Sequence, residues 1–400
     1  MTKKPFHFTV GTRLPGTLAR TGVIHTPHGT INTPAFIPVG TKATLKALTP
    51  EQLKETGAQA VLANAYHLYL RPGHDIIDEA GGLHAFMHWD GPTFTDSGGF
   101  QVMSLGVGFK KVIDMVGKEP VEYQSKKDKL ATIDNDGVTF KSHLDGSLHR
   151  FTPEISMQIQ HGIGADITFA FDELTTLYHD YDYQVESLDK RTHPWAKRSL
   201  AEHKRLNSTR THRPPQALFG VIQGAHYEDL RRKSARFLGA MDFDGYGLGG
   251  ALEKEKIGEI TRWMCEELPE DKPRHMLGIS EPDDIFACIE NGADTFDCVS
   301  PARVGRNGAL YTKKGRVNIR RAEFARDYTP FDSDCTCYTC QNYTKAYLHH
   351  LFRSSELLAN TLATIHNEQF IVKLVDDIRA SIENGTFSLF KDEFLKSYYS

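Results

Sequence analysis

Several short apolar runs of this chain end on a residue that can do chemistry. The runs "TFTDSGG", "ITFAFDE", "LFGVIQG", "GYGLGG" and "DTFDCV" supply, in that order, Asp96, Asp172, Gln223, Gly250 and Asp297. Carboxylates act as nucleophiles or as general acids and bases, while amides and backbone N–H groups bind polar rings. One Asp after a strand is ordinary turn chemistry. The recurrence of such endings predicts a shared site.

Asp297 and Cys298 are neighbours, and both side chains are potential nucleophiles. Successive side chains of a strand point to opposite faces, so only one of them can face the site. If Asp297 faced the other way, its carboxylate would lie in an apolar layer, which is costly unless a hydrogen-bond donor or a cation accompanies it. We therefore predict that Asp297 faces the site and that Cys298 is a buried, inert thiol.

The elements that must position these residues follow from the spacing of the apolar runs. Helical stretches at 183–206, 228–241 and 254–268 separate several of the later runs. Strands that alternate with helices form parallel sheets, so the sequence predicts an α/β fold, a (β/α)8 TIM barrel over residues 1–400. The reacting groups of such barrels lie at the carboxyl ends of the strands, which would bring the five endings together. The runs cover 35–40, 60–66, 93–99, 167–173, 218–224, 245–250, 275–280 and 294–299.

Composition restricts the class of protein. The chain of 400 residues is 40% hydrophobic and 24% charged, which is typical of a globular protein, and it has no apolar run long enough to span a membrane. The start, "MTKKPFHFTV", lacks the apolar core of a signal peptide, so we expect a cytoplasmic location. The net charge is −4, yet the segment 301–326 holds eight Lys or Arg against one Glu. That segment predicts a site for a polyanion.

A cysteine cluster indicates a metal site. "CTCYTC" places Cys335, Cys337 and Cys340 as C-x-C-x-x-C, and three thiolates need a fourth ligand to close a tetrahedral zinc site. Spacing alone leaves His349, His350 and His366 open as that ligand. A site closed by four protein ligands has no open position, so we expect a structural role for the zinc ion.

Long blocks of the sequence resemble bacterial tRNA-guanine transglycosylases, also called queuine tRNA-ribosyltransferases. The blocks, in family order, are "TDSGGFQVMSLG", "GVTFKSHLDGSLHRFTPEISMQIQ", "FDE", "LFGVIQG", "FDGYGLGG", "FDCVSPAR" and "CTCYTCQNYTKAYLHHL…TIHN". The resemblance implies a zinc-containing TIM barrel. It also implies that the enzyme replaces guanine at the anticodon wobble position of tRNA with a 7-deazaguanine, without cutting the chain.

The resemblance assigns roles residue by residue. It makes Asp297 the nucleophile that attacks the ribose and Asp96 the general acid and base. Asp172, Gln223 and Gly250 match the base-reading positions, and Ser97, Phe100 and Ala251 would complete the pocket. His366 matches the fourth ligand of a structural Zn2+ ion held with Cys335, Cys337 and Cys340.

The resemblance also implies partners. A subdomain of about 301–370, basic and zinc-binding, would contact the anticodon stem-loop, and a homodimer is expected. A longer stretch than usual, 110–136, would be an insertion near the active-site mouth. The residues expected to contact tRNA are Arg303, Arg306, Lys313, Lys314, Arg316, Arg320 and Arg321.

Two departures from the family pattern affect the expected substrate. Residues 251–255 read Ala-Leu-Glu-Lys-Glu, and Leu174 follows "FDE". The family favours 7-aminomethyl-7-deazaguanine as the incoming base, and these changes keep queuine, taken up by salvage, as the alternative. Two other readings are a non-catalytic tRNA-binding subunit and a barrel glycoside hydrolase that uses Asp96 and Asp297 as its carboxylate pair. The glycoside hydrolase reading leaves the basic segment and the zinc site unexplained.

Overall fold

A closed parallel barrel forms the centre of the molecule. The computed structural model describes residues 5–107 and 131–400. Its strands are β4 (Ala35–Pro38), β5 (Val61–Ala63), β6 (Thr93–Thr95), β10 (Ile167–Phe169), β11 (Ala217–Ile222), β12 (Gly245–Leu248), β13 (Arg274–Met276) and β14 (Thr295–Cys298). They pair in the order β4-β14-β13-β12-β11-β10-β6-β5, and the Gly40 N–H donates to the Leu62 carbonyl at 2.7 Å, which closes the ring. Each predicted run coincides with one strand, and β11 and β13 begin one residue before their runs, so the predicted (β/α)8 barrel is confirmed.

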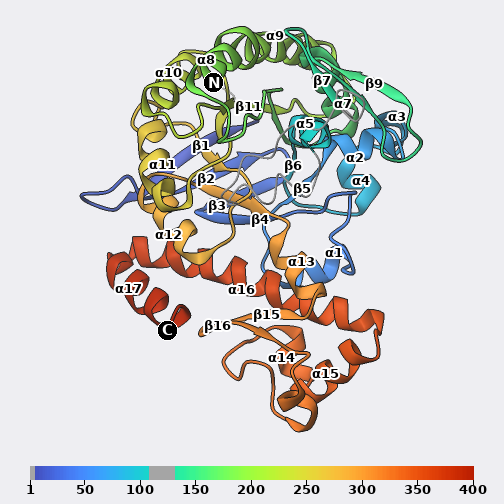
Figure 1. Cartoon of the computed structure of the whole chain (residues 1–400), viewed down its shortest axis with the longest axis vertical. Helices are drawn as coiled ribbons and strands as arrows, with labels where there is room; N and C mark the ends of the chain where they lie inside the picture. The colour runs from blue at the N-terminus through green and yellow to red at the C-terminus, as the bar shows by residue number, and fades with distance from the viewer. Residues whose placement is uncertain (1–4, 108–130) are drawn as a thin grey trace.

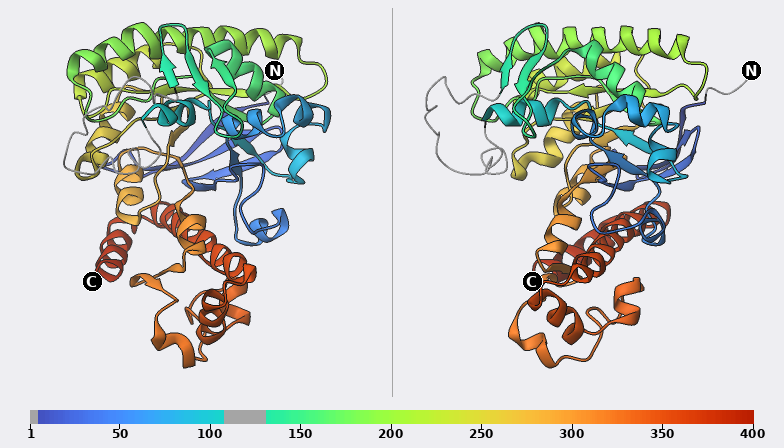
Figure 2. Two further views of the ribbon diagram at one scale, coloured as in Figure 1. Left: turned by 45° about the vertical axis from the view of Figure 1, so that its right-hand side comes forward. Right: turned by 90° about the vertical axis from the view of Figure 1, so that its right-hand side faces the viewer.

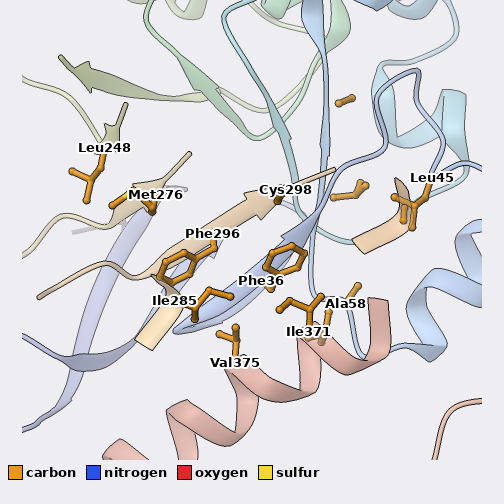
Figure 3. Packing of buried hydrophobic residues seen from close by; sticks show 14 of the residues in the cluster. Phe36, Leu45, Ala58, Leu248, Met276, Ile285, Phe296, Cys298, Ile371 and Val375 are labelled. Carbon is orange, nitrogen blue, oxygen red and sulfur yellow. The ribbon is translucent and has the colours of Figure 1, made fainter. Parts of the chain in front are cut away.

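Strand side chains alternate between two packed layers, as the pleat requires. Phe94, Phe169 and Phe219 fill the barrel interior. Phe36 and Phe296 point outward into the layer between strands and helices, where Ile371 and Val375 of α16 (Leu357–Glu383) face them (Figure 3). Each strand therefore contributes to both layers, and polar side chains fit only at its ends or beside a buried partner.

Helices surround the barrel (Figure 1). Two predicted helical stretches are α10 (Glu228–Gly239) and α11 (Ile257–Cys265). The stretch 183–206 is divided: a π-helical turn, Leu188–Thr192, separates α8 (Tyr181–Ser187) from α9 (His193–Thr209). The other helices of the ring are α1 (Pro50–Glu55), α7 (Pro153–Ile163), α12 (Pro282–Glu290) and α16.

A small antiparallel sheet covers the amino end of the barrel. It consists of β1 (His7–Arg13), β2 (Arg20–Thr26) and β3 (Gly29–Thr33), and Ile24 and Ile31 enter the interior cluster. Asp166, directly before β10, accepts hydrogen bonds from His28 at 2.6 Å, His84 at 3.0 Å and the Thr93 N–H at 2.9 Å. Both oxygens of Asp166 are therefore occupied by hydrogen bonds within the protein. This cluster of side chains joins the small sheet to the barrel.

A separate lobe follows β14. It contains α13 (Ser300–Arg306), β15 (Ala309–Thr312), β16 (Gly315–Asn318), α14 (Tyr338–Asn342), α15 (Lys345–Arg353) and α17 (Phe387–Tyr398). Figure 2 shows this lobe below the barrel, with α16 extending from one to the other. Of the expected insertion 110–136, residues 110–130 lie outside the described residues, and 131–136 form β7 (Ala131–Ile133) and the turn after it. No helix within 5–107 or 131–400 is long and apolar enough to cross a membrane.

Candidate functional site

The polar strand endings meet at the carboxyl end of the barrel, as predicted. Asp96 follows β6, Asp172 follows β10 and Gln223 follows β11, while Gly250 follows β12 and Asp297 lies near the end of β14. Since all these strands are parallel, the residues share one mouth. The roles expected for them from the sequence are not tested by position alone, so their surroundings matter.

Asp96 is a half-buried carboxylate surrounded by donors. It accepts hydrogen bonds from Asn64 Nδ2 at 2.5 Å, the Ala65 N–H at 2.7 Å and Gln101 Nε2 at 2.8 Å. Loss of solvent nevertheless raises its pKa, and the charge of nearby Asp297 adds to this. A carboxyl group in such surroundings is suited to hold and release a proton.

Asp297 faces the mouth, with 14% of its side chain exposed. One oxygen, Oδ1, accepts from the Gly278 N–H at 3.1 Å and lies 3.1 Å from His275 Nε2. Cys298 points the other way, into the outer apolar layer, and burial raises the pKa of its thiol. The predicted orientation of this pair is therefore confirmed.

Asp172 and Gln223 form the wall of a polar pocket. Gln223 Nε2 donates to Asp172 Oδ2 at 2.7 Å, and Ser97 Oγ lies 3.5 Å from Asp172 Oδ1. Burial raises the pKa of Asp172 to about 6. Gln223 is only 2% exposed, and its Oε1 has no hydrogen-bond partner among the residues that the structure describes. An orphaned buried acceptor is costly, which is what a site that awaits a donor from its ligand would show.

Gly250 completes this wall. Its φ is +96°, and a β-carbon there would lie 2.6 Å from Gln223 Oε1. Only glycine fits both the conformation and the space. The next residue, Ala251, is buried, whereas the Phe100 side chain is 45% exposed. Leu174 is half-buried, and its N–H lies 3.1 Å from the sulfur of Met103.

Arg231 supports the same wall from below and was not predicted. It is fully buried on α10 and donates to the carbonyls of Ala225 at 2.7 Å, Ile222 at 3.2 Å and Gly249 at 2.6 Å. Burial lowers its pKa to about 9. This guanidinium ties together the ends of β11 and β12, which carry Gln223 and Gly250.

Sequence reasoning also missed Asn64, Gln101, His275 and Gly278. Asn64 follows β5 as Asp96 follows β6, so the same rule about strand endings would have found it. His275 lies inside a strand and opposite Thr295 of the next strand, and only the sheet register places it near Asp297.

Four side chains in the lobe converge as a metal centre would require. His366 Nδ1 lies 3.7 Å from Cys335 Sγ, 3.5 Å from Cys337 Sγ and 3.3 Å from Cys340 Sγ. A tetrahedral zinc ion, bound at its usual distances, separates sulfur and nitrogen ligands by about 3.5 Å. His366 Nε2 donates to the Tyr311 carbonyl at 2.7 Å, which leaves Nδ1 for the metal. The group therefore fits zinc and selects His366 over His349 and His350, whose Nδ1 atoms lie near the Ile319 carbonyl and Ser354 Oγ.

The basic segment lies between the mouth and the metal centre. Lys313 and Lys314 form the exposed turn between β15 and β16, and Arg303 is exposed on α13. Arg306 is half-buried, and Arg316 pairs with Glu281. Arg320 and Arg321 are exposed, and the guanidinium of Arg320 stacks 5.4 Å from the ring of Phe352. Six of the seven cations are exposed and Arg306 is half-buried. Three of the exposed cations form surface ion pairs, Lys313 with Asp334, Arg316 with Glu281 and Arg321 with Glu323.

Comparison with known proteins agrees with this geometry. A family model described as Queuine tRNA-ribosyltransferase matches residues 16–400. A queuine tRNA-ribosyltransferase of Caldanaerobacter subterraneus is 48% identical over 386 residues, 96% of this chain and 95% of that one. Proteins of the same name from Pelotomaculum thermopropionicum and Geobacillus thermodenitrificans are 44% and 45% identical and cover 98% and 95% of this chain, and 98% and 93% of their own length. With a family match and relatives that extend over nearly its full length, the chain belongs to the queuine tRNA-ribosyltransferase family.

Proposed function

We propose that this chain is a tRNA-guanine transglycosylase, a pentosyltransferase of queuosine modification that exchanges the wobble guanine of a tRNA anticodon for a 7-deazaguanine base. The observation that carries the proposal is the pair of carboxylates at one barrel mouth in different surroundings. Asp96 is surrounded by donors and has a raised pKa, whereas the hydrogen bonds that Asp297 accepts from the described residues reach one oxygen only. Such a difference suits a proton carrier beside a nucleophile.

The exchange proceeds by two displacements at the same carbon. Asp297 attacks C1′ of the ribose; the new bond to Oδ2 forms as the glycosidic bond to guanine breaks and its electron pair moves onto the base. Asp96 gives the departing base a proton. The incoming base then loses a proton to Asp96 and attacks C1′, and the bond to Oδ2 returns its electrons to the carboxylate. The transition states have oxocarbenium character, so a nearby carboxylate stabilises both.

The pocket wall reads the base. The Asp172 carboxylate accepts from the N–H edge of a guanine-like ring, while the second Nε2 hydrogen of Gln223 and a backbone N–H at Gly250 donate to its carbonyl. Ser97, Phe100 and Ala251 border this space. We propose 7-aminomethyl-7-deazaguanine as the incoming base; Leu174 and the loop 251–255 border its substituent, and queuine is the alternative.

The lobe serves the tRNA. Its exposed cations, Lys313 and Lys314 among them, would bind phosphates of the anticodon stem-loop, and the target base would leave the stack to reach the recessed mouth. Zinc, held by Cys335, Cys337, Cys340 and His366, would stabilise the lobe and take no part in the displacement. The family resemblance further supports a homodimer and a cytoplasmic location; sedimentation at several concentrations would test the former.

Covalent trapping tests the proposal directly. Purified protein is incubated with unmodified tRNA and radiolabelled guanine, and label in tRNA and a tRNA adduct stable to denaturing gels are measured. Asp297→Asn should abolish both, whereas Asp377→Asn, a change on α16 at a half-buried carboxylate paired with Lys373, should leave them unaltered. Wild-type-like exchange by Asp297→Asn would sink the proposal, and inactive wild-type protein would favour a non-catalytic subunit.

The incoming base is identified by a chase. tRNA charged with labelled guanine is treated separately with 7-aminomethyl-7-deazaguanine, queuine and 7-cyano-7-deazaguanine. Fastest release by the aminomethyl base supports the proposed substrate. Release by queuine alone would show that Leu174 and the loop 251–255 have altered the pocket for salvage.

A further inference from the structure

His275 is a fully buried histidine inside the barrel and next to the proposed nucleophile. Its ring packs between Phe94 and Phe169, with centroids 5.4 and 5.3 Å away, and the side chain has no exposed surface. Histidine in an apolar interior needs a reason, because both ring nitrogens must find partners there. One nitrogen lies beside Thr295 and the other beside Asp297.

Each nitrogen of the ring has one polar neighbour. Nδ1 lies 2.8 Å from Thr295 Oγ1, and Nε2 lies 3.1 Å from Asp297 Oδ1. A carboxylate can only accept, so Nε2 must carry the hydrogen that it donates. In the neutral ring the threonine hydroxyl donates to Nδ1, and this chain of hydrogen bonds, Thr295 to His275 to Asp297, connects β14 to β13 and back.

The same oxygen of Asp297 receives a second donor. The Gly278 N–H, in the loop after β13, also reaches Oδ1 at 3.1 Å. Within the part of the chain that the structure describes, the hydrogen bonds to this carboxylate end on Oδ1. The carboxylate is therefore fixed through one oxygen, and Oδ2 is the oxygen left for the ribose.

From this asymmetry, and resting on the proposed function, we infer that His275 is a positioning residue. It holds Asp297 so that Oδ2 attacks C1′, and its Nε2–H stabilises the carboxylate when it leaves again. In the covalent intermediate, Oδ2 is the ester oxygen and Oδ1 the carbonyl oxygen. When the incoming base displaces the ester, the bond from Oδ2 to C1′ breaks and the returning electron pair spreads onto Oδ1.

A donor aimed at developing charge acts mainly on the step in which that charge appears. The His275 and Gly278 donors therefore favour departure of Asp297, the second displacement. They favour attack less, because a hydrogen-bonded carboxylate is a weaker nucleophile. Loss of the imidazole donor should slow breakdown of the covalent intermediate more than its formation. A purely structural residue would have no reason to separate the two steps.

Two substitutions of His275 separate the effect of its hydrogen-bond donor from the effect of its side-chain volume. Glutamine places an N–H near the position of Nε2 and can still donate to Asp297, whereas asparagine reaches only as far as Nδ1. Thr295→Val removes the hydroxyl that fixes the tautomer and keeps the shape. Thr168→Val is the matched control, because Thr168 is a fully buried barrel threonine whose hydroxyl binds the Ala217 carbonyl instead.

The experiment is rapid-quench kinetics with wild-type enzyme and the four variants. Formation of the covalent adduct with guanine-containing tRNA and its breakdown on addition of free guanine are timed separately, with melting temperature and KM for tRNA. We expect His275→Asn to slow breakdown by about 10- to 100-fold, and formation by much less. His275→Gln should recover most of the rate, Thr295→Val should slow breakdown several-fold, and Thr168→Val should leave the ratio of the two rates unchanged.

The outcomes separate this inference from the proposed function. A wild-type enzyme that forms no adduct would refute the function itself. The role of His275 alone would be refuted if the wild-type kinetics are normal but His275→Asn slows formation and breakdown equally. It would also be refuted if His275→Gln does not recover the rate of breakdown. If His275→Asn does not fold, the pair Thr295→Val and His275→Gln decides, since the inference requires slower breakdown in the first and near-normal breakdown in the second.

Discussion

The barrel mouth and the metal centre of the lobe both gather polar side chains, yet they hold them in opposite ways. At the mouth, each side chain comes from a different strand of a closed barrel, so the backbone positions the group. The polar groups at the mouth are incompletely satisfied. Burial raises the pKa of Asp96 and Asp172, and Gln223 Oε1 has no hydrogen-bond partner among the described residues. In the lobe, the loop before α14 and the first turn of that helix supply three thiols, and α16 supplies a histidine.

The difference shows what each region requires from a ligand. The closed barrel fixes the backbone of the mouth, and its packing offsets the cost of the unsatisfied polar groups there. The metal centre has the reverse dependence, because three thiols and an imidazole converge there and need a bound ion to satisfy them. An ion that binds four ligands there contributes directly to folding. Removal of groups at the mouth should therefore change chemistry, and removal of groups in the lobe should change stability.

Loss of the metal should have the largest effect. Cys340→Ser removes one of four ligands, and we expect loss of bound zinc, a fall of several kcal/mol in the free energy of unfolding of the lobe, and loss of tRNA use. Zinc content, thermal melting and exchange measure this. Cys288→Ala, a fully buried thiol outside the cluster, is the control and should cost only about 1 kcal/mol. An unchanged melting temperature in metal-free protein would contradict the claim that the metal centre stabilises the lobe.

Asp96→Asn should have the next largest effect, on rate alone. Asparagine keeps the size but cannot carry the proton, so kcat should fall by about 10²- to 10⁴-fold while melting changes little. A large drop in melting temperature would place Asp96 with the structural residues and erase the contrast between the two regions. Steady-state exchange and calorimetry distinguish the results.

A pH effect should follow from Asp172. Its pKa is about 6, so the carboxylate is ionised above this pH and protonated below it. As pH falls through 6, the acceptor for the base N–H edge is lost, and KM for the free base should rise up to about tenfold per pH unit. Because this pKa lies above that of a carboxyl group in the unfolded chain, protonation of Asp172 also favours the folded state, so melting temperature is recorded beside KM to separate stability from binding. In Asp172→Asn this part of the pH profile should disappear; its persistence would assign the titration to another group.

The smallest effect should come from single cations of the lobe. Lys314→Ala removes one exposed charge, so tRNA affinity should fall a few-fold. The slope of log affinity against log salt should decrease by about 0.7–0.9. Lys373→Ala, an exposed lysine on α16 paired with Asp377, should leave the slope unaltered. Equal slopes for both variants would remove this turn from the tRNA surface.

The sequence predicts the barrel because buried parallel strands have a simple signature, a short apolar run that ends at a turn. Asp96, Asp172, Gln223, Gly250 and Asp297 were found for the same reason, since each lies at or just after the end of such a run. The turn of π-helix at 188–192 has no signal in composition and interrupts a stretch that reads as a single helix.

His275 and Arg231 could not be predicted in the same way. His275 reaches Asp297 only through the register of β13 against β14, and strand register between parallel neighbours is set by the whole barrel. Arg231 looks like one of many charged residues on an amphipathic helix, and its burial depends on the loops that fold over it. The choice of His366 among three histidines likewise needed the fold, because a long helix carries it back to the cysteines.

That helix, α16, also has a consequence for synthesis of the protein. Its residues Ile371 and Val375 cover Phe36 of β4, which the ribosome makes more than 300 residues earlier (Figure 3). At about 5–20 residues per second, β4 waits roughly 15–60 s for the helix that shields it. A nascent chain therefore has an exposed apolar barrel wall for most of its translation, and the helix that ends this exposure also carries the ligand that closes the metal centre.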